Sequence, residues 1–195
     1  MVVLKYRTLI TTLLASSLMA TVVSCSGLPT PQNGARFEKP VTRLELVRML
    51  AGRVKRKPIN FSKKNLSGLE LRRFNFQRDN FTQAYLAKTD FQHGKFRLAI
   101  FEKADLTGVI FVGADLRGAN FRGANLTGVD FTEANLNGAD FSGANLQGAI
   151  FNRSLLQGIK LKGAILYDAR FVNVYLGATD LSHLDLREVD FQGSD

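Results

Sequence analysis

Phenylalanine or leucine occupies every fifth position from Phe61 to Phe191, at 27 consecutive positions without an exception. We call these positions the central residues. An α-helix repeats its apolar positions every 3.6 residues and a β-strand every second residue, so neither element explains a period of five. A strict short period is typical of a solenoid, in which each unit buries its apolar side against the neighbouring units. The pattern predicts one repetitive domain over residues 59–193.

The positions around each central residue are also patterned. In residues 114–128, alanine stands two positions before each central residue, Asp or Asn stands one position before it, and glycine stands two positions after it. A large and a small apolar residue two positions apart can point to the same side of an extended chain. Gly, Asp and Asn supply the backbone freedom and local hydrogen bonding of a turn. Each pentapeptide is therefore expected to form one short side and one corner.

The order of phenylalanine and leucine predicts how many sides make a coil. Between Phe101 and Phe151 the two residue types alternate without a break. A three-sided coil would stack residues 15 apart and mix both types in every column, whereas a four-sided coil stacks residues 20 apart and separates them. The four-sided arrangement gives a pure leucine column from Leu66 to Leu186. At a spacing of roughly 4.8 Å between coils, about seven coils would form a rod about 30 Å long.

The stretch Ala-Asp-Leu-Arg-Gly-Ala-Asn-Phe-Arg-Gly-Ala-Asn-Leu-Thr-Gly at residues 114–128 resembles the pentapeptide-repeat family, whose units read Ala-(Asp/Asn)-Leu-X-X. The resemblance covers about residues 59–193 and implies an all-β solenoid, a right-handed quadrilateral β-helix with four pentapeptides per coil. Units such as Gly94-Lys95-Phe96 and Ser154-Leu155-Leu156 depart from the consensus but keep the central residue. The family includes acidic rods that imitate DNA and protect topoisomerases, so membership alone does not define a function.

The first residues have the layout of an export signal. Lys5 and Arg7 precede an apolar stretch, and Val22-Val23-Ser24-Cys25 resembles a bacterial lipobox. We predict that residues 1–24 are a lipoprotein signal peptide and that lipidation of Cys25 anchors the protein on the periplasmic or outer face of a bacterial membrane. Cys25 is the single cysteine and cannot form an intramolecular disulfide. The alternative is an unmodified thiol within a signal peptide that is cleaved elsewhere.

Two short segments separate this signal from the repeats. Residues 25–39 contain prolines and an Asn-Gly pair, which predicts a flexible tether. Residues 40–57 are predicted to form a helix that starts at Pro40, with an apolar face that includes Val41 and Leu44. This helix is expected to cover the first coil, because open strand edges invite unwanted pairing. Its many basic residues leave binding to a membrane surface as the alternative.

The charge is unevenly distributed along the chain. The formal net charge is +9, with +11 on residues 25–103 and −4 on residues 104–195. Part of the basic half falls on neighbouring sides, and Arg97 and Arg117, twenty positions apart, are expected to stack as like charges on adjacent coils. Stacked cations could attract phosphate or acidic lipid headgroups. The alternative is a solvated face that only keeps the protein soluble. The residues of this candidate anion-binding face are Arg72, Arg73, Arg78, Lys95, Arg97 and Arg117.

We predict no catalytic, metal or cofactor-binding residues, and hence no enzyme. His93 and His183 fall in different columns and lack partners at metal-ligand spacing. Serine residues have no nearby histidine in a recurring frame, and the glycines are spaced as corners rather than as a phosphate-binding loop.

Apolar residues replace Asp or Asn at several outward positions near the end of the chain. Ile150, Leu155 and Tyr175 immediately precede central residues, and Val172 follows one. We expect these four residues to form a partner surface for another protein or for a second copy in a homodimer. Simple drift of the repeat is the alternative.

Together these patterns predict a non-enzymatic, lipid-anchored protein that presents a rigid surface for protein–protein interaction in the bacterial envelope. The alternative is a DNA-mimicking topoisomerase regulator. That class needs an acidic rod in the cytoplasm, whereas this chain is basic and carries an export-like signal. Nucleic acid is not predicted as a partner.

Overall fold

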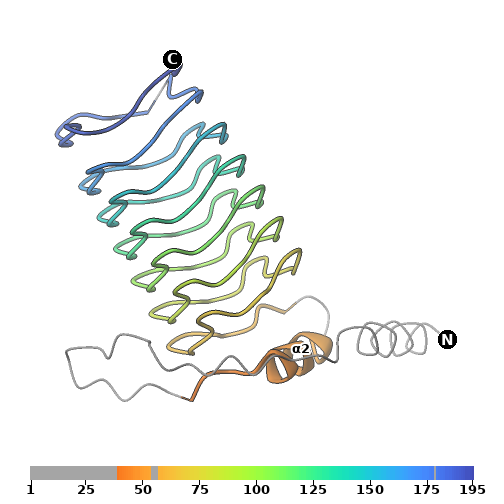
Figure 1. The fold of residues 1–195 in the computed structure, drawn as a ribbon. Coiled ribbons are helices and arrows are strands. Elements are labelled where there is room, and N and C mark those ends of the chain that lie inside the picture. Colours follow the sequence, from red (N-terminus) through yellow and green to blue (C-terminus); the bar gives the residue numbers. More distant parts are fainter. Residues whose placement is uncertain (1–38, 54–56, 178) are drawn as a thin grey trace. The chain divides into compact units, whose positions relative to one another are not determined.

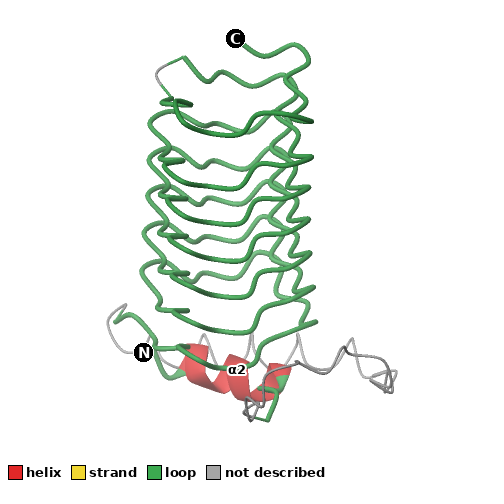
Figure 2. Cartoon of the chain, turned by 90° about the vertical axis from the view of Figure 1, so that its left-hand side faces the viewer, coloured by secondary structure: helices red, strands yellow, loops and turns green. Residues whose placement is uncertain are grey.

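The computed structural model describes residues 39–53, 57–177 and 179–195. The predicted signal peptide, Cys25 and nearly all of the predicted tether lie outside the described residues. The described chain forms a solenoid of stacked coils, with helix α2, Arg43–Ala51, at its start (Figures 1 and 2). No helix of this described part is long and apolar enough to cross a membrane.

Parallel bridges join residues that are twenty positions apart, from Asn60 and Asn80 to Arg170 and Asp190. This register confirms the prediction of four pentapeptides per coil. We number the sides 1 to 4. Their bridged residues start at 60, 65, 70 and 75, respectively, and recur every twenty positions along the chain. Each bridged residue is isolated, so the sides in the described part are shorter than ordinary β-strands.

Each coil is hydrogen-bonded to the coil before it and to the coil after it. The Asn120 N–H donates to the Ala99 carbonyl at 2.9 Å, and the Phe121 N–H donates to the Asp140 carbonyl at 2.8 Å. The corner is closed by the Ala124 N–H, which donates back to the Phe121 carbonyl at 3.0 Å. The repeat therefore pairs most of its polar backbone groups without long strands.

The corners explain the preference for glycine and for Asp or Asn. The residue two positions after the centre has a positive φ, as at Gly123 with 62°, and fourteen described corners place a non-glycine residue there. Such a conformation costs about 1–2 kcal/mol for an L-residue with a side chain. The Asn120 Oδ1 accepts the Arg122 N–H at 3.0 Å, and the same contact recurs along the chain. The repeated Asp and Asn residues thus have a structural role.

The core consists of the central residues and the small residues two positions before them. All central residues from Phe61 to Phe171 are buried. Phe121 stacks between Phe101 at 4.9 Å and Phe141 at 5.0 Å, with interplanar angles of 4° and 3°. After Phe171 the central residues are only partly buried. The described ladder of the last coil continues on sides 3 and 4, where Arg170 bridges to Asp190 and the Leu176 N–H bonds to the Asp195 carbonyl at 2.7 Å.

Helix α2 is shorter than the predicted helix of residues 40–57. It starts after Thr42, not at Pro40, because Thr42 and Glu45 form a capping box. The Glu45 N–H donates to the Thr42 Oγ1 at 3.2 Å, and the Thr42 N–H donates to the Glu45 Oε2 at 2.8 Å. These bonds satisfy amides that would otherwise be free at the helix start. The helix ends with Ala51, and Gly52 is its C-cap.

The buried face of α2 also differs from the predicted one. Leu46 is fully buried, and Val41 and Leu50 pack against the same core as the coils. Leu44, which helical periodicity placed on the buried face, is 48% exposed. The Val41 N–H donates to the Asn65 carbonyl at 2.8 Å, which fixes the start of the helix against the first coil. Alpha-helical spacing alone did not distinguish Leu44 from Leu46 because apolar residues occur on both faces.

A buried ion pair joins the segment after α2 to the solenoid. Asp79 is fully buried, at an inward position where alanine is the commonest residue of the repeats. Its carboxylate pairs with Arg53 and accepts the Ile59 N–H at 2.8 Å. Burial raises the pKa of Asp79, while the Ile59 N–H and the Arg53 guanidinium oppose that rise. Asp79 therefore connects the segment after α2 and the start of the first coil to the second coil.

Candidate functional site: side 4 of the solenoid

Side 4 brings several of the sequence-predicted residues into one row. The row spans five steps of about 4.8 Å, or roughly 24 Å. It begins beside α2 and ends near the last coil. Its bridged residues are Asn75, Lys95, Asp115, Asn135, Leu155 and Tyr175.

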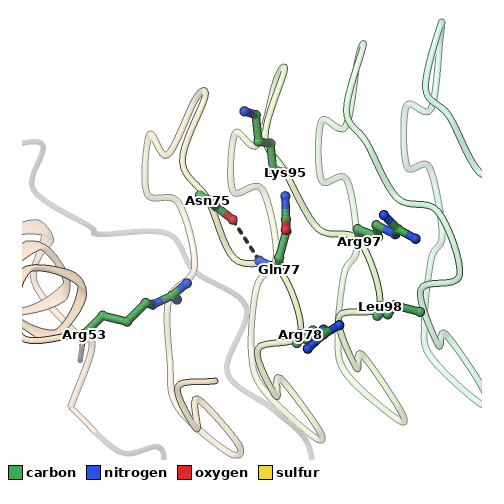
Figure 3. Close-up of a pocket in the computed structure, with 7 residues that line it drawn as sticks. All are labelled: Arg53, Asn75, Gln77, Arg78, Lys95, Arg97 and Leu98. Atoms are coloured by element: carbon green, nitrogen blue, oxygen red, sulfur yellow. Dashed lines mark hydrogen bonds between the residues drawn. The ribbon is translucent and has the colours of Figure 1, made fainter. Parts of the chain in front are cut away.

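A pocket of about 440 Å³ opens at the α2 end of side 4. Its lining side chains come from two adjacent coils and from the segment after α2 (Figure 3). The charged members are Arg78, Lys95 and Arg97 on the coils and Arg53 after the helix. Its neutral members are Asn75, Gln77 and Leu98.

Two departures from the repeat shape this pocket. At most bridged positions an Asp or Asn side chain accepts the backbone N–H of the residue two positions later. Lys95 stands at such a position and has no acceptor oxygen, so no short side chain covers the backbone N–H of Arg97. Leu98 lies at a corner with φ of 59° and is 44% exposed. A Cβ atom at Gly118 would come within 2.8 Å of the Leu98 Cδ2, so the bare glycine leaves room for this leucine.

The predicted anion-binding face is only partly brought together. Arg78, Lys95 and Arg97 share the pocket, whereas Arg73 does not line it. Arg72 instead pairs with Asp90 at 2.6 Å. Sequence reasoning missed Arg53; an aspartate at the inward position 79 was the available signal that a nearby cation must be buried with it.

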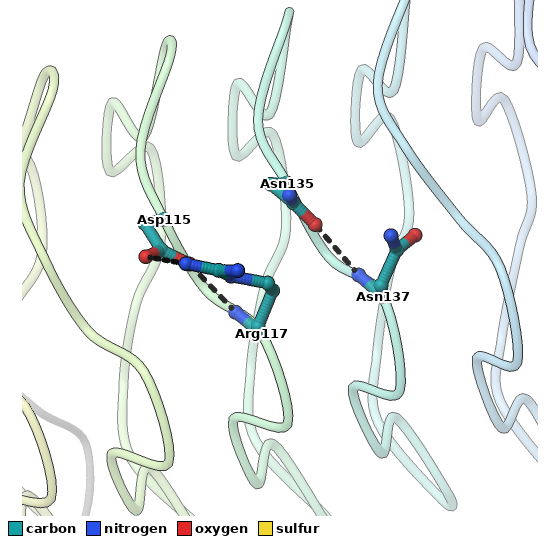
Figure 4. A network of polar contacts seen from close by, with 4 residues as sticks. All are labelled: Asp115, Arg117, Asn135 and Asn137. Atoms are coloured by element: carbon teal, nitrogen blue, oxygen red, sulfur yellow. Dashed lines mark hydrogen bonds and ion pairs between the residues drawn. The ribbon is translucent and has the colours of Figure 1, made fainter.

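The sixth predicted residue, Arg117, is neutralised by its own coil. Its guanidinium donates to both carboxylate oxygens of Asp115, at 2.8 and 2.7 Å (Figure 4). The hydrogen bond from Arg117 lowers the pKa of Asp115, although burial opposes the shift. The expected stack of like charges on Arg97 and Arg117 is therefore interrupted. One coil on, the Asn135 Oδ1 accepts the Asn137 N–H at 3.3 Å.

The far end of side 4 is apolar. Leu155 is bridged to Tyr175, and their side chains are 55% and 65% exposed. Ile150 and Val172, which sequence reasoning placed in the same patch, are partly buried, and Ile150 is a bridged residue of side 3. The exposed surface is thus narrower than predicted and centres on Leu155 and Tyr175.

The chain compensates for the missing Asp or Asn at position 155. The Gln157 N–H, which such a residue would accept, donates instead to the Asn137 Oδ1 of the preceding coil at 2.9 Å. A Cβ atom at Gly177 would collide with the Tyr175 ring, so this ring lies against the glycine backbone. The corner after Leu155 thus keeps a side-chain acceptor, and the bridge between Leu155 and Tyr175 is retained.

A second pair of exposed apolar residues lies elsewhere. Ile165 is a bridged residue of side 2 and is 56% exposed, and Tyr167 beside it is 54% exposed. Sequence reasoning missed both residues. The rule that singled out Leu155, an apolar residue in place of Asp or Asn, also applies to Ile165 and would have found it.

The described residues hold no group of three or more His, Cys, Asp or Glu side chains that could bind a metal ion. His93 lies against Gly113, where a Cβ atom would be 2.5 Å from its Nδ1. His183 occupies a corner of the last coil with φ of 61°. Both histidines are therefore found at corners of the solenoid.

The four-sided coil, the ladder between residues twenty apart and the regular corners define a pentapeptide solenoid. The family model "Pentapeptide repeats" matches overlapping stretches, in eight copies, that together span residues 65–193. The chain belongs to the pentapeptide-repeat family, whose members are generally non-enzymatic structural or binding proteins. The matched stretches are residues 65–102, 84–123, 99–138, 124–163, 139–177 and 154–193.

Solved structures of pentapeptide-repeat proteins resemble the chain. Rfr23 from the cyanobacterium Cyanothece is 26% identical, with a TM-score of 0.52 over 66% of this chain and 88% of that protein. A thylakoid-lumen protein from Arabidopsis thaliana is 34% identical over 56% of this chain and 66% of that protein, with a TM-score of 0.39. The fold matches that of right-handed quadrilateral β-helices. Comparison with curated protein sequences gives no significant match.

Proposed function

We propose that this protein is a non-enzymatic, lipid-anchored scaffold that presents side 4 to another protein in the bacterial envelope. The observation that carries the proposal is the pair of neighbouring exposed side chains, Leu155 and Tyr175, on an otherwise polar face. Tyrosine is enriched at the centres of protein interfaces, and adjacent exposed apolar residues favour a binding role. The partner is a protein with an apolar contact surface or a second copy of this chain.

The rigidity of the solenoid supports this role. The Leu155 N–H donates to the Ala134 carbonyl at 3.0 Å, and the Leu155 carbonyl accepts the Leu136 N–H at 2.9 Å. Both bonds join Leu155 to the preceding coil, and the residues on either side of Tyr175 bond to Asp195: the Leu176 N–H donates to the Asp195 carbonyl at 2.7 Å, and the Val174 carbonyl accepts the Asp195 N–H at 3.1 Å. The backbone that carries each apolar residue is thus hydrogen-bonded to a neighbouring coil before any partner binds. A preformed surface loses little conformational entropy on association, so even a small patch contributes usefully to affinity.

The charge distribution supports a scaffold over a DNA mimic. A mimic must present rows of anions, because the phosphate backbone dominates the electrostatics of DNA. Side 4 instead starts with a pocket that holds Arg78, Lys95 and Arg97, continues with a neutralised pair, and ends in apolar residues.

Substituting aspartate for both Leu155 and Tyr175 is expected to weaken partner binding by at least about thirtyfold. Two charges would replace the apolar contact while the ladder below remains intact. Photocrosslinking from position 175 in native membranes would detect the partner, and sedimentation of the mature protein would detect a homodimer. The free energy of unfolding, measured by thermal denaturation, should change by about 0.5 kcal/mol or less, because both side chains are exposed.

Ile165→Asp is the matched control. Ile165 has the same position in its repeat as Leu155 and nearly the same exposure, but lies on side 2. It should leave the side 4 interaction unchanged. Equal loss of binding from the control, or crosslinks and sedimentation that the double variant does not alter, would reject side 4 as the partner surface.

Cys25→Ala is expected to prevent lipidation, because alanine offers no thiol for the diacylglycerol thioether. The variant should leave the membrane fraction or accumulate with an uncleaved signal peptide. Membrane fractionation and the intact mass measure both outcomes. A variant whose fractionation and processed mass match those of the wild type would disprove the anchor and leave the side 4 proposal to its own test.

A further inference from the structure

We propose that the pocket at the α2 end of side 4 binds a phosphate group, carried on a small polar molecule or on a lipid headgroup. This inference is independent of the proposed partner surface, because the pocket and the apolar pair are separate features of side 4.

The three coil cations of the pocket form no ion pair of their own, although Arg97 lies close enough to help lower the pKa of Asp115, which is already paired with Arg117. Among the described residues, the ion pairs include neither Arg78, nor Lys95, nor Arg97. These three cations nevertheless lie around one pocket on adjacent coils. Like charges held together repel one another, and an anion between them would remove that repulsion. Arg53 has its own partner in Asp79, so it adds donors more than net charge.

The backbone provides an additional donor in the same place. In the pentapeptides directly below and above, the Asn75 Oδ1 accepts the Gln77 N–H at 3.1 Å and the Asp115 Oδ1 accepts the Arg117 N–H at 3.4 Å. Lys95 has no oxygen for the equivalent Arg97 N–H, which has no acceptor among the described residues. A ligand oxygen can occupy the position that the carboxylate or amide oxygen holds elsewhere, as anions do in other backbone amide sites.

The neutral lining and the size indicate more than a bare ion. A volume of about 440 Å³ lies in the range of sites for small organic ligands. The Asn75 and Gln77 amides can hydrogen-bond hydroxyl groups, and Leu98 provides an apolar wall. Guanidinium groups recognise phosphate through paired, charge-assisted hydrogen bonds, which suits Arg78 and Arg97. A phosphorylated polyol such as a glycerophosphate combines these features.

Two variants remove the site without damaging the fold. Lys95→Asn deletes a charge and restores the common Asn, whose Oδ1 should accept the Arg97 N–H. Arg78→Gly deletes a charge at a corner with φ of 64°, where glycine relieves backbone strain. Arg73→Gly is the control, because Arg73 lies at a corner with φ of 61° but does not line the pocket. All three proteins should unfold at or above the wild-type temperature.

The full chain would be titrated with glycerol 3-phosphate by calorimetry and with vesicles of phosphatidylglycerol or phosphatidylcholine by co-sedimentation. We expect saturable binding of the free phosphate ester, or of the anionic vesicles alone if the ligand is a headgroup. Lys95→Asn and Arg78→Gly should each weaken it about tenfold or more, while Arg73→Gly should bind like the wild type. Added salt should weaken binding as well.

Failure of both probes to bind the wild-type protein would overturn the proposal. Wild-type affinity in Lys95→Asn and Arg78→Gly would also overturn it, as would an equal loss in the Arg73→Gly control, because binding would then follow total charge rather than the pocket.

Discussion

Phe121→Ala is expected to lower the free energy of unfolding by about 3–5 kcal/mol. Phe121 is fully buried between two parallel rings and faces the edge of a third, Phe111, at 6.2 Å. The coils above and below are hydrogen-bonded to its own coil and cannot collapse into the space that the ring leaves. Chemical denaturation of the full chain measures the change.

The neighbouring residue provides the control for this prediction. Arg122 is exposed, and its ion pair with Asp140, at 3.3 Å, lies in solvent. Arg122→Ala should therefore change the free energy of unfolding by about 0.5 kcal/mol or less. Similar losses from both variants would show that the assignment of inward and outward positions is wrong.

Arg53→Met is expected to destabilise the protein by about 3 kcal/mol at pH 7. The substitution keeps much of the side-chain volume but leaves the Asp79 carboxylate buried without its cation. Burial already raises the pKa of this carboxyl group, and loss of the guanidinium should raise it further. Denaturation at a series of pH values measures the effect.

The expected pH dependence has a definite sign. A carboxyl group whose pKa is higher in the folded state binds a proton more readily there than in the unfolded chain, so lowering the pH favours folding. The loss in Arg53→Met should therefore be full above the folded-state pKa and shrink as the pH falls through it. The double variant Arg53→Met, Asp79→Ala is the control and should lack this dependence. A pH-independent loss in the single variant would contradict a buried, charged Asp79.

The solenoid could be predicted closely because one physical constraint repeats. Every central residue must point inward, and the order of phenylalanine and leucine around Phe121 distinguishes a repeat of 20 from one of 15. The ends of the domain carry no such redundancy. The start of helix α2 depends on a single capping box at Thr42 and Glu45, and the spacing of apolar residues gives no sign of these two polar residues.

The candidate site was harder to predict because charges find partners that periodicity does not specify. Arg97 and Arg117 occupy equivalent positions twenty residues apart. Arg117 follows Asp115 and pairs with it, whereas Arg97 follows Lys95 and lines the pocket. The identity of one preceding residue thus decides whether an arginine is available to a ligand. The two consensus departures noted in the sequence, at Lys95 and Leu155, mark the two ends of the candidate site.

The twenty-residue register also fixes the distance and the relative orientation of side chains along one side of the solenoid. Lys95 and Leu155 face the same way because sixty residues, a whole number of coils, separate them. Gain or loss of one coil between them would change their separation by about 4.8 Å and preserve their alignment. Gain of a single pentapeptide would turn Leu155 and Tyr175 onto the adjacent side, away from the pocket. Tandem duplication of twenty residues can therefore change the separation of two surface sites in fixed increments of one coil. Duplication of five residues instead moves every later residue to the adjacent side.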